Sequence, residues 1–451
     1  MPELTTIEIA QLHRADVQPP QAVPSRYDPI RQGAKIILGI PQPSRSQHMA
    51  PIQLQEPNAE QVGISHTTDN SIADKRIGSQ VNEQFFQPYT FNNGATVKNR
   101  LFMAPMTNGQ SHPDGRFSEE ELNWLTMRAQ GGFGAVITAG ASPYEDDLYI
   151  EGQIGAFSDA HEDGLRRFAE MVKREQALSI VQLMPSGMRA KAKLNRGKQP
   201  AGPSVVQLPI PDFEQPRELS EEQIHAILDA LVDSARRVHR AGASGIELHG
   251  ANGYLFTQFF SLTTNLRKDK WGGSVENRAR FLLEAMRRIR ADLPSDFTIG
   301  VKILAEDWNS GRGFDIDEGL EMLRMMNDVG FTYLNLSAMN AKEVSWKYPN
   351  QKQTNLSRVR GVLRGDIPVV ASGSLLTPQE VQDALNDGAD MVALGRAAIL
   401  APDWPKRAAR PDFEIKNFPL TLEELYALGV SPKFVHALRN GLSMWKFIKE
   451  N

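Results

Sequence analysis

The residues with the clearest potential for chemistry lie close together, where His249, Asn252 and Tyr254 follow a short apolar run. Histidine and asparagine can each donate a hydrogen bond to a carbonyl oxygen, and a tyrosine phenol carries a proton that it can transfer. Each residue alone has an ordinary structural interpretation, as a structural histidine, a turn former or a core aromatic. Their joint spacing, with Gly250 and Gly253 between them, favours a site that binds and protonates a carbonyl compound.

Eight short apolar runs, bounded by glycine, proline or polar residues, are expected to position this segment. They are typical of strands buried on both faces, and they span residues 101–105, 135–139, 179–184, 245–249, 298–304, 333–337, 368–372 and 391–394. Helix candidates lie between them at residues 118–130, 220–241, 276–291, 317–329 and 377–386. Ser118 with Glu121 and Ser220 with Gln223 are potential capping boxes, and Pro378 suits a first helical turn.

The alternation of strands with helices predicts a (β/α)8 TIM barrel, an α/β fold. A doubly wound sheet is the alternative, but it usually has a glycine-rich turn after its first strand, where this chain continues with residues 104–107. A barrel carries its functional residues at the carboxyl ends of its strands, which is where His249 falls. Long loops follow the third and fourth strands, at residues 185–219 and 250–275, and loops of this length usually cover a site.

Residues suited to phosphate binding follow the seventh and eighth strands, the usual place in this fold. Gly373 and Gly395 allow backbone N–H groups to approach a phosphate, and Arg396 adds a positive charge. Glycines that serve only a turn are the alternative. The first long loop is either a solvated surface loop or a lid that attracts cofactor phosphates, and its basic residues are Arg189, Lys191, Lys193, Arg196 and Lys198.

The composition of the chain argues against several classes of protein and of functional site. The chain has 451 residues, 41% of them hydrophobic, and a net charge of −4, which argues against a nucleic-acid binder with a basic face. The absence of cysteine excludes disulfides, iron–sulfur clusters and cysteine nucleophiles. The nine histidines are scattered without ligand spacing, so no metal site is expected. No apolar run approaches the roughly 18 residues of a membrane span, and no secretory signal opens the chain, so we expect a soluble cytoplasmic protein.

The chain divides into three parts. Residues 1–80 are rich in proline, glutamine, serine and threonine, and they are interpreted as an N-terminal extension: an arm, a disordered segment or in part an appended tag or linker. Residues 81–404 hold the predicted barrel. Residues 405–451 are expected to form a C-terminal helical segment that packs on it.

The order of residues from His249 onward resembles the active-site strand of the Old Yellow Enzyme family, the FMN-dependent ene-reductases and NAD(P)H:flavin oxidoreductases. The motif continues with Gln258-Phe259, Asn265, Arg267, Asp269, Trp271-Gly272-Gly273-Ser274 and Glu276-Asn277-Arg278. Its later polar residues are interpreted as a loop-bracing network without chemistry. The resemblance covers residues 85–404, and it implies that FMN binds on the barrel, that NAD(P)H reduces it, and that the activated C=C bond of an enone or enal is then reduced.

The resemblance also implies a role for each site residue. His249 and Asn252 hold the carbonyl oxygen of the substrate, and Tyr254 protonates its α-carbon. Lys302 faces the pyrimidine edge of the flavin and stabilises its anionic reduced form, which would explain a charge inside an apolar strand. The other contacts to FMN are assigned to Pro105, Met106, Thr107, Gly140 and Gln182 around the ring system, and to Ser372, Gly373, Ser374, Gly395 and Arg396 around the phosphate.

The chain departs from the family pattern in residues 184–189. Many relatives have a histidine and an arginine where this chain has Pro185 and Met188, which changes the rim of the substrate pocket. The flavin contacts are unaffected.

Other functions fit the sequence less well. A flavin barrel that reduces uridine in tRNA would need a basic face and usually a cysteine. A two-domain relative with an iron–sulfur centre is disfavoured by the lack of cysteine and by the end of the chain at residue 451. An FMN-binding scaffold or sensor without enzymatic activity, and a flavin barrel with a different substrate class, remain alternatives. The substrate, the choice between NADH and NADPH, and a homo-oligomeric state stay open.

Overall fold

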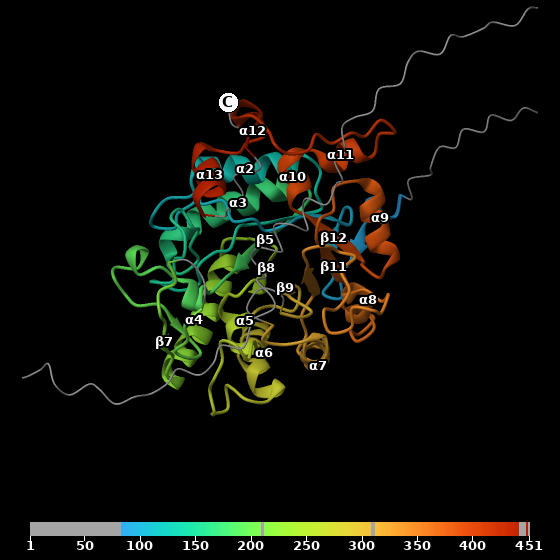
Figure 1. The fold of residues 1–451 in the computed structure, drawn as a ribbon. Helices are drawn as coiled ribbons and strands as arrows, with labels where there is room; N and C mark the ends of the chain where they lie inside the picture. Colours follow the sequence, from blue (N-terminus) through green and yellow to red (C-terminus); the bar gives the residue numbers. More distant parts are fainter. Residues whose placement is uncertain (1–82, 209–211, 308–311, 442–447, 450–451) are drawn as a thin grey trace, which may run out of the picture. The chain divides into compact units, whose positions relative to one another are not determined.

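A computed structural model of the chain describes residues 83–208, 212–307, 312–441 and 448–449, so the predicted extension 1–80 lies outside the described residues. The centre of the fold is a closed barrel whose strands are surrounded by helices (Figure 1). The strands are β3 (Leu101–Met103), β4 (Ala135–Ile137), β5 (Leu178–Leu183), β8 (Gly245–Gly250), β9 (Thr298–Ile303), β10 (Tyr333–Ser337), β11 (Val369–Ser372) and β12 (Met391–Leu394). Neighbouring strands pair in parallel in chain order, and β12 closes the barrel against β3. The predicted (β/α)8 TIM barrel is confirmed.

Five helices match the predicted ones: α2 (Glu119–Gln130), α4 (Glu221–Arg240), α6 (Val275–Asp292), α7 (Ile316–Met326) and α9 (Pro378–Asn386). Ser220 and Gln223 form the predicted reciprocal capping box. The capping box predicted at α2 is wrong for one of its two residues. Ser118 caps the helix, but the Glu121 side chain turns inward and accepts a hydrogen bond from Gln110. The structure also contains helices that were not predicted, among them α3 (Glu162–Arg174), α8 (Asn355–Arg360) and α10 (Arg396–Leu400).

The interior of the barrel is apolar towards the amino ends of the strands. Phe102 and Met391 pack there with Phe91 and Val97, which lie in and beside the hairpin of β1 (Tyr89–Thr90) and β2 (Thr96–Val97). The hairpin therefore fills this end of the barrel. The next layer, towards the carboxyl ends of the strands, is polar, and its buried side chains are Gln182, Glu247, Lys302, Asn335 and Ser372.

The segment after the barrel packs beside α2. It contains α11 (Trp404–Ala408), α12 (Leu422–Ala427) and α13 (Pro432–His436). Arg128 of α2 is buried and donates from Nη2 to the Leu428 carbonyl oxygen at 2.9 Å. The ring of Phe434 meets that of Trp124 edge-on, with 5.1 Å between centroids. No helix in the described part of the chain combines the length and apolar character needed to cross a membrane.

A glycine in β9 makes room for the polar layer. Tyr333 reaches across β9 and donates from its hydroxyl to the buried carboxylate of Glu247 at 3.1 Å. Its ring passes directly over Gly300, where a Cβ atom would lie only 2.1 Å from the Tyr333 Cζ. A side chain at position 300 would therefore displace the tyrosine and remove one donor from Glu247.

We predict that Gly300→Ala lowers the free energy of unfolding by about 1–3 kcal/mol, the usual cost of overpacking a core. Urea denaturation of the purified protein measures the change. Gly365→Ala is the matched control, because an added Cβ there would meet no heavy atom within 4 Å, and it should shift stability by no more than about 1 kcal/mol. Equal effects of the two substitutions would contradict the role given to Gly300.

Candidate active site

A sharp turn at the end of β8 brings His249 and Tyr254 together. The strand ends at Gly250, and Asn252 has a left-handed backbone with a φ of 59°, a conformation that asparagine tolerates better than most residues. Tyr254 then occupies the N-cap position of α5 (Leu255–Phe260). Its ring centroid lies 5.1 Å from that of His249, so the phenol sits beside the imidazole.

The imidazole of His249 is buried, and its Nδ1 atom has no hydrogen-bond partner among the described residues. Burial, together with the positive charges of Lys302 and Arg189, holds the pKa of His249 well below its ordinary value. The ring is therefore neutral at pH 7, with one donor and one acceptor nitrogen. Buried polar atoms are rarely left unbonded, so the lack of a partner at Nδ1 is an unusual feature of this imidazole.

Arg189 is a site residue to which the sequence analysis assigned no specific contact. Its guanidinium group lies over the ring of Tyr254, 4.9 Å from the centroid. Its Nη1 atom donates to the backbone oxygen of Asn252 at 2.8 Å. One side chain thus holds both the turn and the phenol, and it adds positive charge beside His249.

Three other basic residues of the same loop have partners within the protein. Arg196 and Lys198 both pair with Asp146, the arginine at 2.6 Å. Lys191 donates to the backbone oxygen of Asp212 at 3.1 Å. For these residues the contacts favour loop stabilisation over the alternative role of attracting a cofactor phosphate.

Lys302 and Gln182 lie around the carboxylate of Glu247. Lys302 is opposite His249 in the register between β8 and β9, and only 6% of its surface is exposed. Burial lowers the pKa of its ammonium group, while the charge of Glu247 acts in the opposite direction. Gln182 donates from Nε2 to Glu247 at 2.8 Å, which fixes the orientation of its amide. Both residues therefore have defined places in the polar layer beneath the strand ends.

The predicted phosphate residues come together at the ends of β11 and β12, which are neighbours in the barrel. Gly373 has a φ of 143°, and a Cβ atom there would lie 2.8 Å from the Ala341 nitrogen, so the position needs glycine. Arg396 donates from Nη2 to the Ser374 hydroxyl at 2.7 Å. Gly395 lies directly before Arg396, at the start of α10. Two glycine backbones and a guanidinium group at one rim fit a phosphate monoester.

The remaining predicted residues follow β3 and β4. Pro105, Met106 and Thr107 are partly buried after β3, which lies between β12 and β4. The Thr107 hydroxyl shares a hydrogen bond of 2.6 Å with the hydroxyl of Tyr149. A Cβ atom on Gly140 would lie 2.5 Å from the sulfur of Met184, so this methionine packs directly against the glycine. All the predicted residues thus lie in the polar layer or at the carboxyl ends of the strands.

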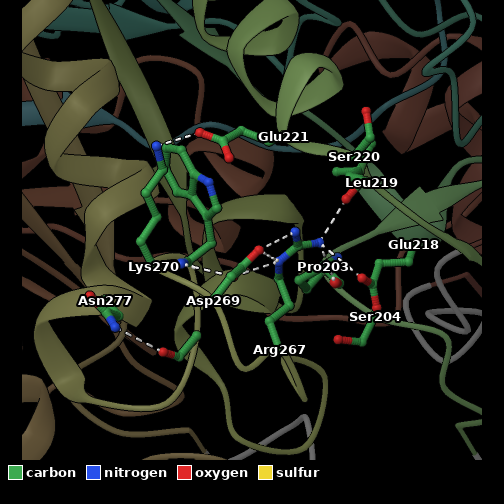
Figure 2. A network of polar contacts seen from close by, with 12 residues as sticks. Pro203, Ser204, Glu218, Leu219, Ser220, Glu221, Arg267, Asp269, Lys270 and Asn277 are labelled. Carbon is green, nitrogen blue, oxygen red and sulfur yellow. Dashed lines mark hydrogen bonds and ion pairs between the residues drawn. The ribbon is translucent and has the colours of Figure 1, made fainter.

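The bracing network predicted for the loops is confirmed, and Figure 2 shows its central part. Arg267 donates from Nη1 to the backbone oxygens of Leu219 at 2.6 Å and Pro203 at 3.2 Å, and it pairs with Asp269. It therefore ties the loop after β8 to the loop after β5. Asn277 donates to the backbone oxygen of Gly272 at 3.1 Å, while Asn265 and Arg278 bind the backbone oxygens of Phe259 and Phe260.

Tyr149 also lies at the site, and no prediction from the sequence included it. This residue lies in the loop between β4 and α3, among the acidic residues Glu145, Asp146 and Asp147, and no motif marks it. Its ring packs edge-on against Tyr254, with 5.3 Å between centroids. The only signal in the sequence was a large aromatic residue in a loop otherwise expected at the surface.

A family model described as the NADH:flavin oxidoreductase / NADH oxidase family matches residues 84–411. The chain belongs to this family. A probable NADH-dependent flavin oxidoreductase of Bacillus subtilis, YqiG, is 31% identical over 324 residues, which are 71% of this chain and 86% of that protein. The NADH:fumarate oxidoreductase of Klebsiella pneumoniae is 32% identical over 335 residues, 73% of this chain. This chain spans only 36% of the length of that relative, so the activity of the longer protein is not carried over.

Solved structures give the same assignment. An old yellow enzyme homologue from Zymomonas mobilis matches with a TM-score of 0.68 and 27% identity, covering 78% of this chain and 98% of that one. A 2-naphthoyl-CoA reductase in complex with 2-naphthoyl-CoA matches with a TM-score of 0.67 and 27% identity, over 73% of this chain and 53% of that one. The Old Yellow Enzyme resemblance is confirmed, with FMN as cofactor and NAD(P)H-dependent oxidoreductases as the enzyme class.

The residues of this chain suit FMN. The phosphate end has the Gly373 backbone and the Arg396 charge, and the ring end has the buried amide of Gln182. Lys302 contributes a cation to the same layer. Such a cation favours negative charge on a flavin pyrimidine edge placed above it.

We predict that Lys302→Ala lowers the midpoint potential of the bound FMN, because the substitution removes a buried positive charge beside the site. Spectroelectrochemical titration of the purified holoprotein measures the potential. Lys173→Ala is the control, since Lys173 is exposed in the last turn of α3, which precedes the amino end of β5. An unchanged or higher potential in Lys302→Ala would show that the ammonium group does not face the flavin.

Proposed function

We propose that this protein uses NAD(P)H to reduce the activated C=C bond of α,β-unsaturated carbonyl compounds. The observation that carries the proposal is the pairing of a neutral, buried His249, whose Nδ1 is unbonded among the described residues, with the phenol of Tyr254 beside it. A neutral imidazole can donate to a carbonyl oxygen, and a phenol at this distance can protonate the same molecule. Bound FMN would supply the hydride that NAD(P)H delivers.

His249 and Asn252 are proposed to hold the carbonyl oxygen of the substrate. As the C=C bond is reduced, negative charge develops on that oxygen, and donors placed in advance stabilise it. Burial is the main cause of the lowered pKa of His249, and the positive charges of Lys302 and Arg189, which lower it further, strengthen this effect. The donors therefore act most strongly when the charge has developed, which is the requirement for catalysis.

Tyr254 is proposed as the acid that protonates the α-carbon. Its ring is held between His249, at 5.1 Å between centroids, and the guanidinium of Arg189, at 4.9 Å. These contacts fix the direction of the hydroxyl, and a fixed donor is more effective than a mobile one. Cofactor binding is assigned to the residues predicted from the sequence around the ring and the phosphate. The expected homo-oligomer and cytoplasmic location remain predictions.

An anaerobic titration tests the proposal. NADH or NADPH should bleach the flavin absorbance of the holoprotein, and 2-cyclohexenone should then restore it with formation of cyclohexanone. A flavin that is bleached but not restored by enones would favour a different substrate class. A flavin that neither nucleotide reduces would favour a scaffold or sensor.

We predict that Tyr254→Phe slows enone reduction while flavin reduction by NAD(P)H keeps its rate. Loss of a placed acid typically costs about 10² to 10⁴ in rate, whereas hydride delivery to the flavin needs no proton from the phenol. Stopped-flow absorbance follows the two half-reactions separately. Tyr426→Phe, at an exposed residue of α12, is the control and should change neither. Equal slowing of both half-reactions in Tyr254→Phe would mean that the phenol positions ligands instead of donating a proton.

A further inference from the structure

Arg189 belongs to the segment 184–189, in which the chain departs from the family pattern. We propose that Arg189 binds a carboxylate that the substrate carries next to its carbonyl group, so that the protein acts on unsaturated oxo acids of the 2-oxo-3-enoate type. This inference rests on the proposed function, because it names the substrate class of the same site.

The guanidinium group of Arg189 lies beside both residues that are proposed to act on the carbonyl side of the substrate. Its Nη1 donates to the backbone oxygen of Asn252 at 2.8 Å, and its central carbon lies 4.9 Å from the centre of the Tyr254 ring. Asn252 is proposed to hold the carbonyl oxygen, and Tyr254 is proposed to protonate the α-carbon. An anionic group bound by Arg189 would therefore lie close to the carbonyl carbon.

Most of the hydrogen-bond donors of Arg189 remain available to a ligand. Among the residues that the structure describes, its guanidinium group pairs with no carboxylate and donates to Asn252 alone. In the same loop, by contrast, Arg196 and Lys198 both pair with Asp146. A guanidinium group presents parallel N–H groups that match the two oxygens of a carboxylate. Because the Arg189 side chain is exposed, a ligand can reach these donors.

The charges around His249 also favour an anionic ligand. Burial, and then the charges of Lys302 and Arg189, lower the pKa of His249, so both cations act on the place where the carbonyl group would bind. The charge of Lys302 is opposed by the carboxylate of Glu247 in the layer beneath. Arg189 has no such counterpart in the described part of the chain. Its charge therefore attracts a negatively charged substrate.

The backbone that carries Arg189 is held by buried acceptors. The Asp147 carboxylate accepts from the backbone nitrogen of Ser186 at 2.6 Å, and Gln258 accepts from that of Met188 at 3.1 Å. Met188 stands where many relatives have arginine, and its side chain is buried. The next residue, Arg189, therefore carries the positive charge at this place. A donor that is held in position before binding loses little conformational entropy when the ligand arrives.

The phosphates of the nicotinamide cofactor are the other anions that could reach Arg189. In such a cofactor a ribose separates the phosphates from the reacting nicotinamide ring. Arg189, however, packs on the ring of Tyr254 itself. A carboxylate bonded directly to the carbonyl carbon fits this short separation better than a phosphate beyond a ribose. The reaction itself is unchanged: hydride and a proton add to the C=C bond and give the saturated oxo acid, and the carboxylate keeps its bonds.

Two compounds that differ in one charge test the proposal. 2-Oxo-3-pentenoate and its methyl ester carry the same C=C–C=O unit, and stopped-flow absorbance of the reduced holoprotein gives a second-order rate constant for each. In Arg189→Gln the ratio of the acid rate to the ester rate should fall about tenfold to a hundredfold, the usual range for loss of hydrogen bonds to a charged group. The ratio cancels any disturbance of the turn that affects both compounds.

Further measurements separate charge from geometry. Arg189→Lys should lose only part of the preference for the acid, because lysine keeps the charge but not the planar fork. Added NaCl should lower the wild-type ratio, since salt screens an exposed charge. Lys268→Gln is the matched control, because it removes one positive charge from an exposed side chain in the loop after β8, and it should keep the wild-type ratio.

Binding of the saturated product gives a readout without turnover. 2-Oxopentanoate should perturb the flavin absorbance of the oxidised wild-type holoprotein, and its Kd should rise at least about tenfold in Arg189→Gln. The Kd of its methyl ester should change much less. Melting temperature and FMN content of each variant establish that it is folded and loaded.

The contrary outcomes are distinct. Equal losses with acid and ester would make Arg189 only a support for the turn, and slower flavin reduction by NAD(P)H with an unchanged ratio would assign it to the cofactor phosphates. Either result overturns the proposal. A reduced wild-type flavin that 2-cyclohexenone reoxidises but 2-oxo-3-pentenoate does not would overturn this proposal alone. Failure with the acid, the ester and 2-cyclohexenone would remove the proposed function as well.

Discussion

A single buried carboxylate organises the polar layer of this barrel. Glu247 is fully buried and accepts hydrogen bonds from Gln182 at 2.8 Å, Asn335 at 2.9 Å and Tyr333 at 3.1 Å. A charge inside a protein is tolerated only with such partners, because its lost hydration must be replaced. The donors come from β5 and β10, and the charge of Lys302 acts from β9. The hydrogen bonds that the Glu247 carboxylate requires therefore fix the positions of the side chains directly beneath the candidate active site.

At the carboxyl ends of the strands, above this layer, residues in the loops hold the site residues in position. Their hydrogen bonds run mainly from a side chain to the backbone of another loop, as for Arg267 to Leu219, Asn195 to Leu148 and Arg189 to Asn252. Backbone oxygens and nitrogens in a loop lack the partners that a strand or helix provides, and side chains supply them. The same contacts hold the phenol of Tyr254 and its neighbours in place, which is the support that a site on loops needs.

Much of the fold followed from local patterns. Each apolar run became a strand, because burial on both faces demands continuous apolar residues and leaves a recognisable signature. Only half of the capping box predicted at Ser118 and Glu121 forms. Ser118 caps the helix, because this contact depends only on the local backbone, whereas the Glu121 side chain accepts a buried hydrogen bond from Gln110. The basic loop was harder to interpret, because charge alone does not reveal that Arg196 and Lys198 both pair with Asp146.

By itself the sequence determined the barrel, the family and the chemical character of the groups at the strand ends, because these are encoded in residues that are neighbours along the chain. Only the tertiary structure decided that Arg189 covers the ring of Tyr254 and that Tyr149 reaches the same phenol from the loop after β4. Contacts of this kind join segments far apart in the chain and depend on how loops satisfy their backbone groups. Such contacts follow no sequence periodicity and no fixed spacing, so no pattern in the sequence predicts them.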